Sequence, residues 1–325
     1  MRMNPEVSII VPLYNKANEV ERAIDSIFAQ TIQDFELIIV DGGSTDGSLD
    51  VIKRYENDSR YNLIHQVSKG VSGARNEGIS SATAELITFL DADDAWLPHY
   101  LEMIMKLNQN YPKAGIFATA YYIDNPQKNN RDIICCSDVT KTFEGLLPSY
   151  YHAISTGPHP IITSGVGIPK SILNQIGGFD EKLSIGEDLD LWAKIALYHP
   201  VAYSTTPLWI YYMETANNHL STAKNKEKIE IPFLEYIHKN MQDSVHFYES
   251  KNNISLYIAY LYILQAQELA YAGNKKMARR ALTQAKHQEI IFKKIGCWMY
   301  INLPRKYFKI LLKITGKFTK IGQTL

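Results

Sequence analysis

The sequence predicts an α/β fold, with a mostly parallel sheet flanked by helices and a helical C-terminal extension. Two observations support this prediction. Short apolar runs alternate with stretches of helical spacing through the first 90 residues, and beyond Ser221 only helical patterns occur. Strands that alternate with helices form parallel sheets with right-handed crossovers. We therefore expect a first domain over residues 1–220 and a helical region over residues 221–325.

The expected elements follow in chain order. A helix that Asn18 can cap and that ends near Gln30 follows the first strand. Another begins at Ser48, and a third runs from a glycine-rich segment to about Ala84. The expected strands are 7–12, 35–40, 61–65, 85–90, 115–123 and 161–168, with a loop over 125–138. The later expected helices are 98–110, 188–198, 227–240, 254–272, 275–288 and 304–321.

Composition excludes several classes of protein. The chain has 325 residues, 46% hydrophobic and 21% charged, as in ordinary globular proteins. Its formal net charge is zero, so we expect no nucleic-acid partner. Cys135, Cys136 and Cys297 form no metal or disulfide pattern, which is typical of a reducing compartment. Neither a signal-peptide pattern nor a run of 18 apolar residues is present, so we expect a cytoplasmic protein.

A run of carboxylates follows the fourth expected strand. Asp91, Asp93 and Asp94 stand within four residues, and their mutual repulsion requires a counter-ion. An Asp-x-Asp pair at the carboxyl end of a strand offers hard oxygen ligands to Mg²⁺ or Mn²⁺, with which a protein can hold a diphosphate. We expect Asp93 and Asp91 to bind such a metal. A short acidic loop without a metal is the alternative.

Two other strand ends carry groups suited to a nucleotide base. Pro12 and Tyr14 follow the first strand, where the tyrosine ring can stack on a flat base or serve only in packing. Asp41 ends the second strand before Gly42 and Gly43, which let the backbone approach a ligand. Its carboxylate can accept the imide N–H of uracil, or only cap its own turn. The segment matches neither the GxGxxG nor the P-loop fingerprint.

Charged residues also accompany two expected helix starts. Lys69 and Arg75 flank a glycine-rich start, where cations and free N–H groups suit an anion. A solvated surface charge is the alternative. Glu187 and Asp188 open a later helix, where acidic residues also simply complement the helix dipole. This second pair therefore gains weight only from the Gly177-Gly178-Phe179-Asp180 segment that precedes it.

Taken together, residues 7 to about 210 resemble the family 2 glycosyltransferases of bacterial polysaccharide assembly, which have the GT-A fold. Five ordered motifs carry the resemblance. They are Val7-Ser8-Ile9-Ile10-Val11-Pro12-Leu13-Tyr14-Asn15, Val40-Asp41-Gly42-Gly43-Ser44-Thr45-Asp46-Gly47-Ser48, Ala74-Arg75-Asn76, Asp91-Ala92-Asp93-Asp94 and Gly178-Phe179-Asp180 with Glu187-Asp188. Any one motif alone would be weak, and their common order makes the match specific.

The resemblance implies a GT-A catalytic domain, a nucleotide-sugar donor, a divalent metal (Mg²⁺ or Mn²⁺) and inversion at the anomeric carbon. By motif position, Tyr14 and Asp41 hold the base, and Asp91 holds the ribose or the metal. Asp93 binds the metal. Asp188 takes the proton of the acceptor hydroxyl, with Glu187 beside it on the acceptor side. Pro12, Lys69 and Arg75 complete the expected donor-binding set.

The chain departs from the family in two places. Gly42 stands where many members have a second aspartate, which leaves Asp41 alone to recognise the base. Tyr211-Tyr212-Met213-Glu214-Thr215 stands where many members have Tyr-Arg-x-His. His219, four residues further on, is either a substitute metal ligand or a surface residue.

The C-terminal end has a one-sided charge. No acidic residue follows Glu289, whereas eight lysines and arginines do. Winding residues 304–321 as a helix separates the cations from an apolar, aromatic face. Such a helix lies in the interface of an anionic membrane; a helix packed on the protein is the alternative. We expect peripheral contact with the inner face of the cytoplasmic membrane, and a glycan or lipid-linked acceptor.

The sequence thus predicts an inverting, metal-dependent glycosyltransferase with a UDP-sugar donor. Two alternatives stay open. A metal-dependent nucleotidyltransferase shares the α/β plan and the acidic site but does not need Glu187 and Asp188. A non-catalytic nucleotide-sugar-binding protein would bind UDP without hydrolysing the donor.

Overall fold

The structure is a computed structural model that describes residues 5–127, 130–183, 185–213, 231–240 and 247–302. The chain divides into two compact units. Unit 1 comprises residues 1–150 and 159–214, and unit 2 comprises residues 151–158 and 215–325.

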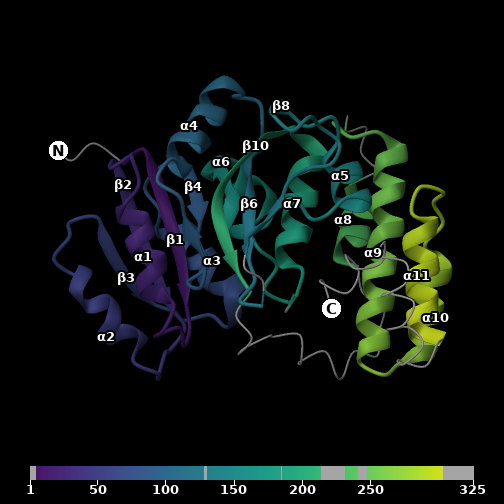
Figure 1. Cartoon of the computed structure of the whole chain (residues 1–325), viewed down its shortest axis with the longest axis horizontal. Helices are drawn as coiled ribbons and strands as arrows, with labels where there is room; N and C mark the ends of the chain where they lie inside the picture. The colour runs from purple at the N-terminus through teal and green to yellow at the C-terminus, as the bar shows by residue number, and fades with distance from the viewer. Residues whose placement is uncertain (1–4, 128–129, 184, 214–230, 241–246, 303–325) are drawn as a thin grey trace. The chain divides into compact units, whose positions relative to one another are not determined.

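The N-terminal half of unit 1 is a parallel sheet in the strand order β3-β2-β1-β4 (Figure 1). Its buried runs of Val, Ile and Leu are typical of strands covered on both faces. The strands are β1 (Val7–Leu13), β2 (Phe35–Asp41), β3 (Tyr61–His65) and β4 (Leu86–Phe89). The helices between them are α1 (Val20–Phe28), α2 (Ser48–Ile52) and α3 (Gly70–Ser81), with the 3₁₀ turn η1 (Lys53–Tyr55) after α2.

The strand order reverses at β1, which has β2 on one side and β4 on the other. Ligands of open α/β sheets bind at such a switch point, beyond the carboxyl ends of the strands. The register pairs Leu13 with Asp41 and Asp41 with His65, so the ends of these three strands are level. The fold therefore brings the residues that follow β1, β2 and β4 to one edge of the sheet.

The second half of the sheet is mixed. An antiparallel strand, β9, joins β4 to β6, and β10 then pairs in parallel with β6. The strands are β5 (Ala95–Trp96), β6 (Ile116–Asp124), β7 (Asp132–Ile134), β8 (Glu144–Leu146), β9 (Val166–Pro169) and β10 (Val201–Tyr212). The helices are α4 (Tyr100–Asn110), α6 (Lys170–Ile176) and α7 (Glu187–Tyr198).

Several predicted bounds are wrong. The strand expected over 161–168 begins only at Val166, because residues Thr163–Gly165 form the 3₁₀ turn η2. The loop expected over 125–138 contains β7, which pairs with β6. Helix α1 begins at Val20 after Glu19 and has no side-chain cap, so Asn18 does not cap it. The short strands β5 and β8 were not predicted either, since they pair only at the edges of β10.

Unit 2 is helical in the part that the structure describes. Its helices are α5 (Tyr150–Thr156), α8 (Pro232–Asn240), α9 (Lys251–Tyr271), α10 (Lys275–Gln284) and α11 (Ile291–Asn302). Small residues such as Ala266, Ala278 and Ala281 are buried where α9, α10 and α11 pack together. No described helix is long and apolar enough to cross a membrane. The predicted helix 304–321 and His219 lie outside the described residues.

Candidate active site

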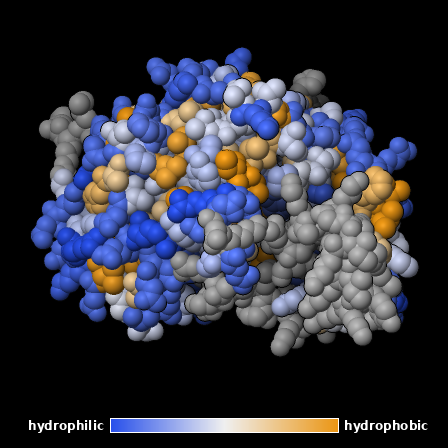
Figure 2. All heavy atoms as spheres, viewed as in Figure 1, coloured by the Kyte–Doolittle hydropathy of each residue, from blue (hydrophilic) through white to orange (hydrophobic). Residues whose placement is uncertain are grey.

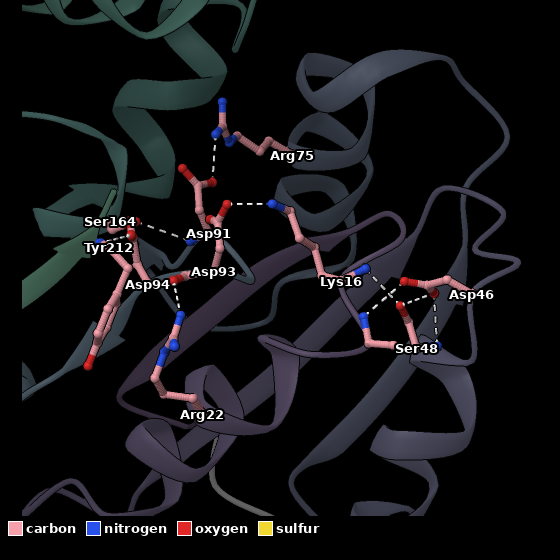
Figure 3. A network of polar contacts seen from close by, with 11 residues as sticks. Lys16, Arg22, Asp46, Ser48, Arg75, Asp91, Asp93, Asp94, Ser164 and Tyr212 are labelled. Carbon is pink, nitrogen blue, oxygen red and sulfur yellow. Dashed lines mark hydrogen bonds and ion pairs between the residues drawn. The ribbon is translucent and has the colours of Figure 1, made fainter. Parts of the chain in front are cut away.

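The aspartate run after β4 forms a tight turn fixed by one serine. Asp94 N donates to Asp91 O at 3.0 Å, and Ser164 of η2 bonds to both ends of the turn. Asp91 N donates to Ser164 Oγ at 3.2 Å, and Ser164 Oγ donates to Asp94 Oδ2 at 2.6 Å (Figure 3). Asp94 is 2% exposed and also accepts from Tyr212 N at 3.3 Å. Asp94 therefore anchors the turn, while about a third of the Asp91 and Asp93 side chains stays exposed.

The electrostatics of the turn agree with this division. Burial, followed by the charges of Asp93 and Asp91, raises the pKa of Asp94 well above its usual value. Desolvation disfavours a charged carboxylate, and nearby like charges add to the effect. A carboxyl group inclined to keep its proton serves as a structural hydrogen-bonding group. The charged chemistry of the turn is thus left to Asp91 and Asp93.

Two cations from the first helix region contact Asp93. Lys16 Nζ lies 2.6 Å from Asp93 Oδ2, and Arg22 Nη2 donates to the Asp93 carbonyl at 2.6 Å (Figure 3). The Arg22 guanidinium also lies 3.7 Å from the centroid of the Tyr212 ring. Neither cation is among the site residues predicted from the sequence. The only signal for Lys16 is its place directly after the Tyr14-Asn15 pair.

The loops after β1 and β2 are fastened to each other by side chains. Asn15 N donates to Ser44 Oγ at 3.0 Å, and Thr45 N donates back to Asn15 Oδ1 at 2.8 Å. Lys16 N donates to Ser48 Oγ at 2.8 Å. These bonds use the Ser, Thr and Asn residues of the first two motifs. They hold Tyr14, 58% exposed, beside the turn that follows Asp41.

Asp41 is buried at the end of β2 and is engaged by its own turn. It is 2% exposed and accepts from Gly43 N at 3.1 Å and Ser44 N at 3.2 Å. The ring of His65, which the sequence analysis did not identify, lies 3.8 Å from Asp41 Oδ2. The carboxylate therefore caps its turn in the structure. Its contact with a uracil base stays a prediction.

The missing second aspartate has a structural counterpart. A Cβ atom at Gly42 would lie 2.9 Å from Oε1 of Gln66 and 3.5 Å from the Tyr14 ring. Gln66 is held by its amide, because Nε2 donates to Gly70 O at 2.7 Å. The Gln66 side chain thus occupies part of the space that a side chain at position 42 would need.

Arg75 joins the two acidic motifs. It is 3% exposed, and its Nη2 donates to Asp91 Oδ1 at 2.7 Å while Nη1 donates to Glu187 Oε1 at 2.9 Å. Burial alone would lower the pKa of Arg75, but the charges of Asp91 and Glu187 raise it above its usual value. A guanidinium is planar, always charged and well suited to carboxylates. One rigid cation therefore fixes two carboxylates that are 96 residues apart in the chain.

Asn76 explains why the third and fifth motifs occur together. Its Nδ2 donates to Phe179 O at 2.9 Å, and Phe179 N donates to Asn76 Oδ1 at 2.9 Å. The Phe179 ring packs edge-on against Phe89 and Trp192, at centroid distances of 5.4 and 5.7 Å. At Gly178 φ is +72°, and a Cβ there would lie 2.6 Å from Asn76 Oδ1. Position 178 therefore requires glycine.

Asp188 stands at the start of α7 with a perturbed acidity. Leu189 N donates to Asp188 Oδ1 at 2.7 Å. Burial and the neighbouring charge of Glu187 raise the pKa of Asp188 to about 6, although Arg75 opposes the shift. A carboxylate with a raised pKa in a charged, partly closed site is a candidate general base.

The other two predicted residues lie at the same edge of the sheet. Pro12 is partly buried in β1, in register with Val40 of β2. Lys69 is exposed and immediately precedes α3, where Gly70 adopts a φ of +76°. Their contacts with a donor stay predictions.

The aspartate pair suits a divalent metal that arrives with a diphosphate. Among the described residues, no group of three or more His, Cys, Asp and Glu side chains is placed to hold a metal. Asp91 and Asp93 each use one carboxylate oxygen in an ion pair with Arg75 or Lys16. Mg²⁺ is commonly held by one or two carboxylates, with substrate phosphates and water completing its shell. Two carboxylates with a further oxygen each match that requirement.

Comparison with known proteins identifies the family. The model of the glycosyl transferase family 2 matches residues 8–174, which include four of the five motifs. The chain belongs to glycosyl transferase family 2. An uncharacterised glycosyltransferase of Nostoc sp. is 33% identical over 222 residues, which cover 67% of this chain and 68% of the relative. The predicted family is therefore confirmed, and so is the prediction that the protein is a glycosyltransferase.

Solved structures confirm the GT-A fold of this glycosyltransferase. S. aureus TarS, crystallised with UDP-GlcNAc, has a TM-score of 0.63 at 16% identity, over 92% of this chain and 87% of TarS. The mannosyltransferase PcManGT of Pyrobaculum calidifontis, in complex with GDP-Man and Mn²⁺, has a TM-score of 0.57 at 18% identity. That match covers 95% of this chain and 84% of PcManGT.

Proposed function

We propose that this glycosyltransferase moves a sugar from a UDP-sugar, with inversion, to a hydroxyl of a glycan or lipid-linked acceptor. The observation that carries the proposal is the position of Arg75, 2.7 Å from Asp91 and 2.9 Å from Glu187. Arg75 binds both the donor-side aspartate and the glutamate at the start of α7, at the switch point of the sheet. A donor bound at Asp91 and an acceptor bound at the start of α7 would therefore lie close to each other.

The donor side is formed by the ends of β1, β2 and β4. Tyr14 offers an exposed ring for stacking. Asp41, whose carboxylate caps its own turn in the structure, is the group that we assign to the base edge. Asp91 and Asp93 would hold a divalent metal, whose Lewis acidity would offset the charge of the leaving diphosphate. Lys16, 2.6 Å from Asp93, adds a positive charge where the diphosphate leaves. The nucleotide sugars in the TarS and PcManGT structures support a donor of this class.

The acceptor side is formed by the start of α7. The acceptor oxygen attacks the anomeric carbon from the face opposite the diphosphate, so the new C–O bond forms as the bond to the diphosphate breaks. The proton of that hydroxyl passes to the carboxylate of Asp188, and UDP leaves. A pKa of about 6 makes Asp188 a stronger base than an ordinary aspartate, while it stays ionised at neutral pH. Glu187 keeps Arg75 in place and raises the basicity of Asp188.

Product analysis tests the proposal. The protein is incubated with a panel of UDP- and GDP-sugars and a membrane extract, and products are identified by mass spectrometry, with the anomeric configuration assigned by NMR. We expect UDP release together with a glycosylated product of inverted configuration. Pyrophosphate release would indicate a nucleotidyltransferase, and UDP binding without turnover would indicate a binding protein. Turnover with GDP-sugars alone would refute the uracil assignment of Asp41.

The proposal also includes the compartment. Nucleotide-sugar chemistry suits the cytoplasm, and Cys135, Cys136 and Cys297 are all free thiols in the structure. Free cysteines are typical of reducing compartments. Fractionation of cells that express the full chain, followed by immunodetection, would check this placement.

A further inference from the structure

Basic and acidic residues are divided unevenly along the chain. Residues 269–325 contain 13 of its 34 lysines and arginines but only one of its 34 acidic residues, Glu289. That single acid is already engaged, because its Oε2 lies 3.0 Å from Nε2 of His152. A protein without net charge therefore has a strongly positive segment within unit 2.

Within this segment, α11 exposes an apolar face. Phe292 is 76% exposed, Trp298 54%, Ile291 52% and Ile295 45%. Residues 291, 295 and 298 are spaced by one turn, so they share a side of the helix. The opposite side is buried: Gly296, Cys297 and Ile301 are buried, and the last two belong to the core of unit 2. Figure 2 shows hydrophobic side chains gathered where Figure 1 draws α11. A surface helix normally has the reverse pattern, with polar residues outward.

Cations surround this apolar face, which we call the α11 stripe (Ile291, Phe292, Ile295 and Trp298). Arg279 of α10 donates through Nε to Asn302 Oδ1 at 2.9 Å, so α10 lies against the end of α11. The exposed cations of α10 are Lys275, Lys276, Arg279 and Arg280. On α11 itself, Lys294 Nζ donates to Ala285 O at 2.7 Å, and Lys293 Nζ lies 4.6 Å from the Tyr260 ring centroid. The stripe is thus free of charge and flanked by positive charge.

We propose that α10 and α11 dock on the surface of an anionic lipid bilayer. The α11 stripe enters the interfacial region, and the α10 cations face the lipid phosphates. Aromatic and apolar side chains on one face, with basic residues beside them, are the composition that binds such interfaces. Trp298 suits this place because its ring is largely apolar and its N–H can reach water or headgroups. The structure thereby extends the expected membrane contact from residues 304–321 to a folded surface.

Charge argues against two other occupants of the stripe. A second copy docked stripe to stripe would bring the same α10 cations together. Residues 303–325 contain six lysines and arginines and no acid, so folding them over the stripe would also bring like charges together. An anionic surface removes this repulsion. It is the one occupant among the three whose charge complements that of α10.

Trp298 itself can report on the docking. The other three tryptophans, Trp96, Trp192 and Trp209, are each at most 4% exposed, so changes in emission caused by vesicles arise from Trp298. The full chain is mixed with vesicles of phosphatidylcholine alone or with an equal share of phosphatidylglycerol. We expect a blue shift and protection from acrylamide only with the anionic vesicles, weakened by salt. The Trp298→Phe variant should lose the signal and still co-sediment with the vesicles.

Co-sedimentation of variants completes the test. Phe292→Gln with Ile295→Gln should lower partition to anionic vesicles by roughly tenfold or more, since two apolar side chains are withdrawn from the interface. Lys276→Glu with Arg280→Glu should do the same, whereas Lys113→Glu, an exposed control in unit 1, should change partition little. Donor hydrolysis should stay normal in all these variants, which separates this proposal from the proposed function.

Three results would overturn the proposal. In the first, the stripe variants partition like the wild type. In the second, Trp298 stays open to acrylamide on vesicles. In the third, Trp298 becomes protected with rising protein concentration and no lipid. The last result would assign the stripe to a second copy. Thermal unfolding of each variant, monitored by circular dichroism, checks that a loss of binding is not a loss of fold.

Discussion

In most proteins apolar residues are buried and charged residues are exposed, and unit 1 and unit 2 depart from this rule in opposite ways. In unit 1 the exception is a charge that is buried, because Arg75 is 3% exposed and lies between two carboxylates. In unit 2 it is apolar surface turned outward, along the α11 stripe. Buried charges and exposed apolar patches are both informative. Each is unfavourable in a folded protein, so its presence often marks a function. The difference agrees with the two proposals, which are chemistry on charged ligands in unit 1 and contact with an anionic lipid surface in unit 2.

The largest effect should come from Asp188, the proposed base at the start of α7. The Asp188→Asn variant removes the proton acceptor but leaves the donor side unchanged. We expect a loss of roughly 10²–10⁴-fold in kcat, with UDP affinity within a few-fold of the wild type. Steady-state turnover and calorimetric UDP titration measure the two quantities. Turnover close to that of the wild type would end the assignment of Asp188 as the base.

Removal of Asp93 should abolish the effect of metal on the donor. In Asp93→Ala, added Mn²⁺ or Mg²⁺ should no longer strengthen UDP binding, because one of two carboxylate ligands is gone. EDTA should reproduce this defect in the wild type. Asp50→Ala, which removes an exposed carboxylate of α2, is the matched control and should respond to metal normally. Full activity of the wild type in EDTA would contradict the metal assignment.

Arg75 allows the buried charges to be tested as a stability effect. Arg75→Met leaves Asp91 and Glu187 without their shared partner in a site where Arg75 is buried. Breaking a buried ion pair from one side costs about 3–5 kcal/mol. Adding Glu187→Gln should recover part of that loss, so the two changes should not be additive. Urea unfolding of both single variants and the double variant measures this coupling. Additive losses would show that the pair is not a unit.

Activity should depend on pH through Asp188. The pKa of this group is raised to about 6, so its basic form is lost as pH falls through that value. The value of kcat/KM should fall by about tenfold per pH unit well below 6 and level off above it. Ionisation of Asp188 also lowers the stability of the folded state, because its pKa is higher when folded than when unfolded. This loss of stability is absent well below the ordinary pKa of an aspartate and complete above about pH 6.

The Glu187→Gln variant sharpens the pH test. Glu187 is the charged neighbour that helps to raise the pKa of Asp188, and Arg75 lowers it. Without the charge of Glu187, the acid limb of the profile should move to lower pH. A limb that moves to higher pH would mean that Glu187 acts mainly by orienting Arg75. Asp50→Ala serves again as the control and should leave the profile in place.

The parallel half of the sheet and the acidic turn could be predicted because their signals are local. Strands β1, β2 and β4 are formed by apolar runs, and Asp41 and Asp91 follow two of these runs directly. Strand β9 could not be bounded in this way. Part of the segment predicted as this strand is instead a 3₁₀ turn. Its Ser164 donates a hydrogen bond to Asp94, some 70 residues away in the chain. A long-range bond of this kind leaves no mark in local periodicity.

The ion pairs within the site could not be predicted from the sequence either. The third motif includes Arg75 but does not say what it contacts, and no motif includes Lys16. In the structure Arg75 contacts Glu187, and Lys16 contacts Asp93. The predicted donor-binding role of Arg75 therefore stays a prediction beside its observed ion pairs. Helix α11 was missed for a different reason. It is apolar on both its buried and its exposed side, so it has no amphipathic pattern to detect.

The smallest effect on stability should come from the exposed α11 stripe, in contrast to the buried side of the same helix. Phe292 is 76% exposed, so Phe292→Gln should change the free energy of unfolding by no more than about 0.5 kcal/mol. Ile301, on the opposite side of the same helix, is fully buried, and Ile301→Ala should cost about 2–5 kcal/mol. Urea unfolding of the two variants compares the sides directly. A large loss for Phe292→Gln would mean that the stripe packs against protein in solution, and the contrast between the two units would then disappear. Stability close to that of the wild type for Phe292→Gln, together with weaker vesicle binding, would show that the stripe serves membrane binding and not the fold.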